Sequence, residues 1–249
     1  MSSHITVADD GPIRTVRMNR PDKKNALTAS MYEAMAAALE DANGDATIRC
    51  VVIAGAPGAF SAGNDLVEFS QAAASGEGLG SSATRFLHAL ARSERPLIAA
   101  VQGPAVGVGT TMLLHCDYVV AAADARFSTP FVNLGLVPEA ASSLLAPRLM
   151  GHRRAFELLV MGRPLDAAAA QSCGLVNTVV PPGEVDAAAM KAARDIAALP
   201  AEAVAASRRL MRTPDDIIAR IDEEVRVFKE RLQSAEARAA FDAFLTRKR

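Results

Sequence analysis

The chain has 249 residues, of which 50% are hydrophobic and 22% are charged. These values are typical of a globular protein and exclude a disordered chain, and the length allows one large domain with or without a small appendage. Lysine and arginine total 27 against 28 aspartates and glutamates, and this net charge of −1 argues against a protein that binds nucleic acid through bulk charge.

The N-terminal part is predicted to form a hairpin, a helix and a buried strand. Residues 5–8 and 13–18 are strand-like runs on either side of a turn-forming Asp-Asp-Gly-Pro sequence. Thr28 is expected to cap a helix with apolar residues at every fourth position, and Gly44 stands where this helix should stop. The short apolar run 50–54 is typical of a strand that is buried on both faces.

Three further apolar runs, at 97–101, 118–122 and 175–180, are also predicted to be buried strands. Helical patterns lie between these runs, and strands that alternate with helices indicate βα units with parallel pairing. Residues 71–84 are rich in alanine, serine and glycine with little periodicity, so we expect a mobile loop or a frayed helix there. No apolar stretch reaches about 18 residues, so we expect no membrane-spanning segment.

The C-terminal part is predicted to be helical, with one amphipathic stripe. The apolar residues of the stripe are spaced by three and four positions and are Ile218, Ile221, Val225, Phe228 and Leu232. Two interpretations fit this spacing: a helix that packs on the body of the protein, and a contact between subunits. With about two heptads, the stripe is too short for an independent coiled coil.

Cysteine and histidine usage gives no signal of a metal site. The three cysteines are far apart, and none of the four histidines forms an HExxH motif or pairs with a cysteine, so no metal ion is expected. Free thiols are typical of a reducing compartment, and the first residues lack the pattern of a secretory signal. We therefore expect a cytoplasmic protein.

Two glycine-rich turns, at 55–66 and 102–111, follow predicted strands and are candidates for a ligand site. The first lacks the lysine and hydroxyl of a P-loop, and it also lacks the first glycine of a nucleophile elbow. The second has Met112 where a dinucleotide-binding fingerprint needs its third glycine. None of these three motifs is therefore complete.

The same turns can present backbone amides to a ligand. If residues 107–109 open a helix through His115, their N–H groups point outward at its positive end. A second N–H near Ala62 and Gly63 would complete a pair of donors. Two donors that converge on one oxygen form an oxyanion hole, which serves acyl chemistry. The alternative is that both turns are only tight links between strands and helices.

Glu139 is the candidate acid or base, because it is the only carboxylate between Asp124 and Glu157. The surrounding sequence is apolar, and desolvation would raise the pKa of this carboxyl group and make it a stronger base. Alternatively, Pro138 begins a helix and Glu139 is an ordinary first-turn acid. The residues alone leave both interpretations open.

Several motifs, in the right order, are similar to those of one enzyme family. Residues 19–27 look like its RPxxxNAL segment, residues 60–66 like its FxAGxDL signature, and residues 95–107 like its KPxIAAVxGxAxGxG segment. Residues 116–117 before a strand, and residues 174–177, also fit. Over most of its length the chain resembles the crotonase family, the enoyl-CoA hydratase/isomerase superfamily.

The resemblance implies an α/β fold, a crotonase-like spiral of ββα repeats. A core over residues 1–190 would bind an acyl-CoA thioester, and a C-terminal helical oligomerisation region over residues 191–249 would form a homotrimer or a dimer of trimers. The resemblance therefore favours a contact between subunits as the role of the amphipathic stripe. Coenzyme A is part of the substrate, so no cofactor, metal, nicotinamide or flavin is implied, and no nucleic acid or membrane is an expected partner.

The resemblance also assigns site residues. By motif position, the two oxyanion donors are the backbone N–H groups of Ala62 and Val108. The positions at which the family binds the pantetheine and adenine parts of coenzyme A are held here by Lys24, Ala26, Ala62, Gly63, Asn64, Asp65 and Leu66. Lys248, in the basic tail, lies where the family often places a cation near the phosphates of coenzyme A.

Departures from the family pattern predict the reaction. Family hydratases use two glutamates, whose positions are held here by Thr111 and Phe131, and neither side chain transfers a proton as a carboxylate does. Glu139 instead lies where the similar peroxisomal-type Δ3,Δ2-enoyl-CoA isomerases carry their base. One base suffices for a 1,3-proton transfer, and the expected lining of an apolar pocket around it is Thr111, Phe131 and Leu134.

The resemblance and its departures therefore predict an isomerase that converts 3-enoyl-CoA to trans-2-enoyl-CoA, with Glu139 as the single acid and base. A dienolate intermediate would carry its charge on the thioester oxygen, in the oxyanion hole. One alternative is an enoyl-CoA hydratase or another crotonase-type lyase or hydrolase. An alternative of another class is a non-catalytic homologue that binds acyl-CoA or RNA.

Overall fold

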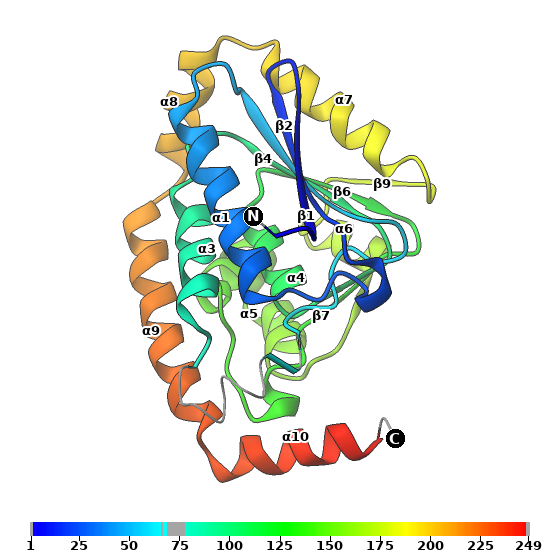
Figure 1. Ribbon diagram of the computed structural model, residues 1–249, viewed down its shortest axis with the longest axis vertical. Coiled ribbons are helices and arrows are strands. Elements are labelled where there is room, and N and C mark those ends of the chain that lie inside the picture. The colour runs from blue at the N-terminus through cyan, green and yellow to red at the C-terminus, as the bar shows by residue number, and fades with distance from the viewer. Residues whose placement is uncertain (1, 66, 69–77, 248–249) are drawn as a thin grey trace.

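The computed structural model describes residues 2–65, 67–68 and 78–247 (Figure 1). Within these residues, the main sheet has six strands in the order β1-β2-β3-β4-β6-β9, and a smaller sheet has three in the order β5-β7-β8. The main sheet comprises β1 (Ile5–Asp10), β2 (Ile13–Met18), β3 (Cys50–Gly55), β4 (Leu97–Val101), β6 (Tyr118–Ala122) and β9 (Thr178–Val180). The smaller sheet comprises β5 (Pro104–Val106), β7 (Arg126–Ser128) and β8 (Leu165–Asp166).

Strands β1 and β2 form the predicted hairpin, in which they pair antiparallel with Ile5 opposite Met18. The other neighbours in the main sheet pair parallel, as the alternation of strands and helices predicts. Successive residues of a strand point to opposite faces. In β3, Val51 and Ile53 accordingly pack in one hydrophobic cluster and Val52 in another, so both faces of this strand are buried.

Helices cover both faces of the main sheet (Figure 1). α1 (Ala29–Gly44) and α3 (Ser81–Arg92) lie side by side on one face, and α7 (Val185–Ala197) packs on the other. Thr28 caps α1 as predicted, because its side-chain oxygen accepts a hydrogen bond from the Met31 N–H at 3.3 Å.

The repeating unit is a strand of the main sheet, a short strand of the smaller sheet, and a helix. β4 is followed by β5 and α4 (Val108–Thr111), and β6 is followed by β7 and α5 (Ser142–Leu159). β3 is followed by Ser61, which forms an isolated bridge to Ala105 of β5, and then by α3. This order confirms the predicted α/β class with ββα repeats. The remaining short elements are η1 (Pro21–Lys23), η2 (Met112–His115), η3 (Val132–Leu134) and α6 (Ala167–Ser172).

The last strand of the main sheet is shorter than predicted. β9 begins at Thr178, whereas the apolar run begins at Leu175. The N–H groups of Leu175 and Val176 donate to the Ala170 carbonyl, so they close helix α6 and do not pair in the sheet. Both side chains are nevertheless buried, which is why the run has the apolar character of a strand.

Helix α3 begins at Ser81, inside the segment 71–84 for which the sequence predicts a loop or a frayed helix. That prediction is wrong for residues 81–84, which form regular helix, whereas residues 71–77 lie outside the described residues. Phe86 and Leu90 are fully buried further along α3 and hold it against the core, beyond the alanine-rich and serine-rich sequence.

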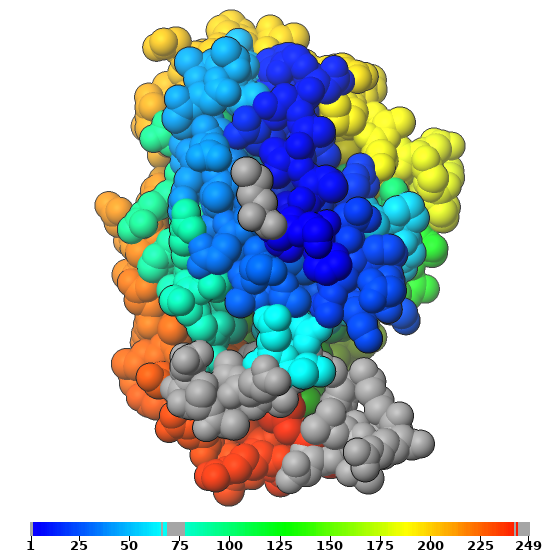
Figure 2. Space-filling view, viewed as in Figure 1, coloured from blue at the N-terminus to red at the C-terminus, as the bar shows by residue number. Residues whose placement is uncertain are grey.

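The C-terminal part of the described chain is helical, as predicted. α8 (Ala201–Met211), α9 (Pro214–Leu232) and α10 (Ala235–Arg247) follow α7. α9 runs along α3, and α9 and α10 form the lower left border of the face in Figure 2. The predicted domain boundary after residue 190 falls within α7 and stays a prediction. Within the described residues, the helices are too short or too polar to cross a membrane.

The amphipathic stripe lies on α9, and two further residues join the predicted members on its inward face. The buried residues of this helix are Ile217, Ile221, Glu224, Phe228 and Leu232. Ile218 and Val225 are only half-buried, but both pack against the core, so the prediction is confirmed at these two positions, and Ile217 and Glu224 extend the inward face one residue earlier in the chain. This face packs within the same chain, as the first of the two interpretations predicts. Assembly through residues 191–249 stays a prediction.

Candidate active site

Glu139 lies in the loop between η3 and α5, and its side chain is buried, with 1% of the residue exposed. α5 begins only at Ser142, so Pro138 does not start a helix and Glu139 is not a first-turn acid. Of the two interpretations left open by the sequence, the structure supports the desolvated carboxyl group. This outcome depends on the tertiary packing around the loop.

The two carboxyl oxygens of Glu139 have different surroundings. Oε1 accepts a hydrogen bond from Thr111 Oγ1 at 2.5 Å, whereas the buried Oε2 has no hydrogen-bond partner among the described residues. Burial raises the pKa of Glu139 to about 8; the Thr111 hydrogen bond lowers it, and the charge of Glu224 adds to the increase. The group can therefore exchange a proton near neutral pH through a free oxygen.

Thr111 reaches Glu139 because the second glycine-rich turn opens helix α4. Gly107 has a φ of 56°, a left-handed conformation that favours glycine, and the helix begins with the next residue, Val108. Thr111 lies at the end of this short helix, where its side chain is buried and faces the glutamate. The position that the family resemblance assigns to a hydratase glutamate therefore holds a hydrogen-bond partner of Glu139.

The two glycine-rich turns lie in direct contact. A Cβ atom on Gly63 would lie 2.8 Å from the Val106 carbonyl oxygen, and one on Gly109 would lie 2.9 Å from the Ser61 carbonyl oxygen. The Val106 N–H also donates to the Ser61 carbonyl at 2.9 Å. Glycine is needed at these two positions because the backbones approach too closely for any side chain.

The amide predicted as the first oxyanion donor is already occupied. The Ala62 N–H donates to the Lys24 carbonyl at 2.9 Å, so this assignment is corrected: in this conformation the amide is not free for a ligand. In the described part of the chain, neither the N–H of Asn64 nor that of Val108 contacts an acceptor. Asn64 follows Gly63, and Val108 follows Gly107, in the two turns that touch.

The segments predicted to bind coenzyme A are held together by polar contacts. Arg20 Nη1 pairs with Asp65 Oδ2 at 2.7 Å and donates to the Ala26 carbonyl at 3.0 Å. Lys24 is exposed and has a φ of 49°, and its carbonyl accepts from Ala62 as described above. Leu66 and Lys248 lie outside the described residues. The remaining predicted positions are thus brought to one region of the structure.

Asn25 and Tyr32 were not identified from the sequence. The fully buried Asn25 donates through Nδ2 to the Ala59 carbonyl at 2.8 Å and accepts from the Arg20 N–H at 2.8 Å, which ties the two motifs together. The Tyr32 hydroxyl donates to Asn64 Oδ1 at 2.5 Å. Burial, with a smaller contribution from the charge of Glu139, raises the pKa of Tyr32 well above its usual range.

Phe131 and Leu134, the predicted pocket walls, belong to one hydrophobic cluster. Phe131 is buried, and its Cε1 atom lies 3.9 Å from the position that a Cβ atom on Gly107 would occupy. Leu134 is half-buried at the end of η3. Both therefore lie on segments that flank the second glycine-rich turn and the loop of Glu139.

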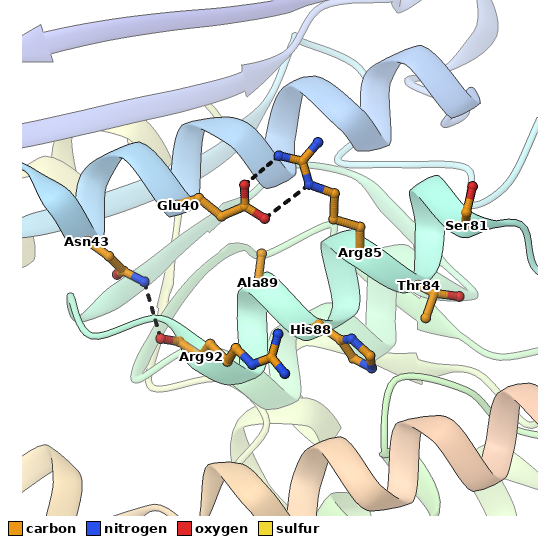
Figure 3. A pocket seen from close by; sticks show the side chains of 8 residues that line it. All are labelled: Glu40, Asn43, Ser81, Thr84, Arg85, His88, Ala89 and Arg92. Atoms are coloured by element: carbon orange, nitrogen blue, oxygen red, sulfur yellow. Dashed lines mark hydrogen bonds and ion pairs between the residues drawn. The ribbon is translucent and has the colours of Figure 1, made fainter.

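Two hollows lie away from Glu139. One, of about 500 Å³, lies beside α1 and α3, where Arg85 forms hydrogen bonds with Glu40 at 3.1 and 2.5 Å (Figure 3). The other, of about 860 Å³, lies beside α8 and is lined by residues of this helix and of the segments that pack around it. Neither is lined by Glu139 or Thr111. Among the described residues there is no group of three histidines, cysteines or acids that could hold a metal ion.

A protein-family model described as enoyl-CoA hydratase/isomerase matches residues 9–249. Enoyl-CoA delta isomerase 2 of Rattus norvegicus is 36% identical over 99% of this chain and 64% of its own length. The chain therefore spans just under two thirds of that relative. The 4-chlorobenzoyl coenzyme A dehalogenase-2 of an Arthrobacter species is 36% identical over 79% of this chain and 73% of its own length.

Solved structures show the same similarity over nearly the whole chain. OdaA of Pseudomonas aeruginosa is 43% identical with a TM-score of 0.93, over 98% of this chain and 99% of the other. An enoyl-CoA hydratase/isomerase from Pseudoalteromonas atlantica T6c is 41% identical with a TM-score of 0.93, over 98% of each chain.

Proposed function

Because the chain belongs to the enoyl-CoA hydratase/isomerase family, we propose that it is an enzyme that moves the double bond of 3-enoyl-CoA to give trans-2-enoyl-CoA. The observation that carries the proposal is the buried Glu139, with one oxygen bonded to Thr111 and the other without a partner among the described residues. A carboxylate with one fixed oxygen and one free oxygen suits proton transfer at carbon.

The proposed reaction needs one base. Glu139 Oε2 removes a proton from C2 of the substrate, and the electron pair of the C–H bond delocalises onto the thioester oxygen to give a dienolate. The same carboxylic acid then returns the proton to C4, the electrons move back, and the C2–C3 double bond forms. One proton is removed and one is returned, so the reaction requires no cofactor. We propose none beyond the coenzyme A of the substrate.

We propose the backbone N–H groups of Asn64 and Val108 as the oxyanion donors. Both amides are without an acceptor in the described chain, and their turns are in contact through Gly63 and Val106. Val108 also lies at the positive end of α4. A single such donor typically contributes about 10²–10³ in rate, because it stabilises the charge that develops on the thioester oxygen.

Hydration is the competing reaction in the same fold. Adding water requires groups that orient the water molecule and transfer its proton. The two positions that carry glutamates in family hydratases hold Thr111 and Phe131, and Thr111 is bonded to Glu139 itself. These observations support isomerisation over hydration. Assembly into homotrimers or dimers of trimers, and a cytoplasmic location, belong to the same proposal.

The proposal is tested by assaying 3-hexenoyl-CoA and trans-2-hexenoyl-CoA side by side with the same enzyme preparation. We expect conversion of the first substrate to trans-2-hexenoyl-CoA to be much faster than addition of water to the second. Hydration faster than isomerisation would replace the proposal with a hydratase. Tight binding of both thioesters without turnover would favour a non-catalytic acyl-CoA-binding protein.

A further inference from the structure

We propose that Glu224 is a positioning residue, whose buried carboxylate on α9 holds the backbone turn that places Glu139 in the active site. This inference rests on the proposed function, because it concerns the glutamate that acts as the base. Glu224 does not contact Glu139 by any hydrogen bond in the described chain. Its charge adds to the raised pKa of Glu139, whereas its positioning effect would pass through the backbone of Ala140 and Ala141.

The turn that follows Glu139 has an unusual backbone. Ala140 and Ala141 have φ values of 62° and 53°, and both residues are fully buried. Left-handed conformations are unfavourable for alanine, because its Cβ atom comes too close to the backbone carbonyl. Two such residues in succession persist only when the surrounding structure holds them. The turn therefore depends on stabilising contacts from the rest of the chain. With glycine in the same two positions it would depend on them less.

Glu224 provides such partners from a distant part of the chain. Its Oε2 accepts from the Ala141 N–H at 2.6 Å, and its Oε1 accepts from the Ser143 N–H at 3.0 Å and from Ser143 Oγ at 2.5 Å. Glu224 is only 6% exposed. Ala141 occupies the N-cap position of α5 and has no side chain to accept these hydrogen bonds. The Glu224 carboxylate thus serves as the cap that the local sequence lacks.

His115 holds the other side of the same turn. Its Nε2 lies 2.8 Å from the Ala140 carbonyl oxygen, which only accepts hydrogen bonds, so Nε2 carries the proton. Burial lowers the pKa of His115 to about 4, so the ring is neutral at physiological pH. The peptide groups next to Glu139 are therefore fixed by His115 from η2 and by Glu224 from α9. Both contacts constrain the position of the backbone from which the Glu139 side chain extends.

Burying the Glu224 carboxylate costs free energy, and hydrogen bonds to its oxygens offset part of that cost. Burial raises the pKa of Glu224 to about 7, and the hydrogen bonds from Ser143 and Ala141 lower it. An apolar residue would continue the stripe of Ile221 and Phe228 without that cost. A glutamate at this inward position of α9 is therefore explained by the backbone groups that it binds.

The experiment compares Glu224→Ala and Glu224→Gln with the control Glu230→Gln, an exposed acid on the same helix that pairs with Arg226. For each folded variant we measure kcat and KM for 3-hexenoyl-CoA, and the affinity for hexanoyl-CoA, which cannot isomerise. Misplacement of the base should lower kcat by about 10- to 100-fold in Glu224→Ala. KM and hexanoyl-CoA affinity should stay within about threefold, because the binding segments are intact.

Glu224→Gln guards against a folding failure, because it keeps the size of the side chain and one accepting oxygen. We expect its kcat to lie between those of the wild type and Glu224→Ala. Wild-type kcat in both variants would overturn the inference. A loss confined to thermal stability, with kcat per binding site unchanged, would also overturn it, because Glu224 would then be a structural cap only.

A second substitution tests the route through the turn. Glycine adopts left-handed conformations without the penalty of alanine, so Ala141→Gly in the Glu224→Ala background should recover kcat several-fold. No recovery would overturn the role of the turn. Glu139→Gln is assayed in parallel: if it retains full turnover, the proposed function fails. If it is inactive while Glu224→Ala is fully active, only the positioning role of Glu224 fails.

Discussion

Thr111 Oγ1 donates a 2.5 Å hydrogen bond to Glu139 Oε1, and the two residues are separated by 28 positions in the chain. The contact joins the helix that follows the second glycine-rich turn to the loop before α5. Among the described residues the other oxygen of the glutamate has no partner, and the Thr111 hydrogen bond partly offsets the effect of burial on the pKa of the carboxyl group. Thr111 therefore tunes and orients the proposed base.

Replacing Glu139 by glutamine should remove the proton transfer while leaving the shape of the site intact. We expect kcat to fall by about 10²–10⁴, which is the usual contribution of a general base. Binding of hexanoyl-CoA, measured by calorimetry, should stay within about threefold of the wild type. The matched control is Glu157→Gln, at a partly exposed acid of α5 that pairs with Arg154, and it should keep its activity. Unchanged product formation by Glu139→Gln would remove this residue from the mechanism.

The pH dependence of kcat/KM should report the pKa of Glu139. Since the base must be a carboxylate to accept a proton, kcat/KM should rise with pH through the value of about 8. Thr111→Val removes the hydrogen bond that lowers this pKa, so the midpoint should move to higher pH. Activity at pH 7 should then fall about tenfold for every pH unit by which the midpoint rises. Thr111→Ser keeps the hydroxyl and should retain the wild-type profile; coincident profiles for all three proteins would contradict the prediction.

The stability of the protein should also depend on the protonation of Glu139. Its pKa is about 8 in the folded protein against an ordinary value of 4.5, so the folded state binds the proton more tightly than the unfolded state. The stabilisation that comes from this tighter proton binding is complete below pH 4.5 and is lost as the pH rises through 8. Glu139→Gln cannot lose a proton, so its free energy of unfolding should increase relative to the wild type across this window.

Urea unfolding at pH 5 and pH 9 measures that difference. A tenfold difference in proton affinity between the folded and unfolded states corresponds to about 1.4 kcal/mol. Glu224, whose pKa is raised to about 7, titrates in both proteins and largely cancels in the comparison. A difference between the two proteins that does not change with pH would show that Glu139 is not desolvated in the folded state.

The contact between the glycine-rich turns predicts different outcomes for two glycines of the same loop. Both have positive φ, 84° for Gly63 and 101° for Gly58, but only Gly63 lacks room, since its Cβ would lie 2.8 Å from the Val106 oxygen. Gly63→Ala should cost about 1–3 kcal/mol more stability than Gly58→Ala. It should also lower kcat, because it displaces Asn64. Equal effects on unfolding and turnover would argue against the close approach.

The local pattern of the chain predicted much of the scaffold. The runs 97–101 and 118–122 form strands with the predicted bounds, and Thr28 caps its helix, because apolar runs and caps depend on neighbouring residues. The start of β9 was wrong because the amides of Leu175 and Val176 close a helix instead. An apolar run does not indicate which groups its backbone amides donate hydrogen bonds to.

Short stretches of residues were enough to identify the family pattern, most strands of the sheet and Glu139 as the one carboxylate of its region. Three features could be seen only in the folded chain: the burial of Glu139 beside Thr111, the occupation of the Ala62 amide by Lys24, and the capping by Glu224 of a turn 83 positions away. These contacts join segments that meet only when the sheets and helices pack, so no local pattern encodes them.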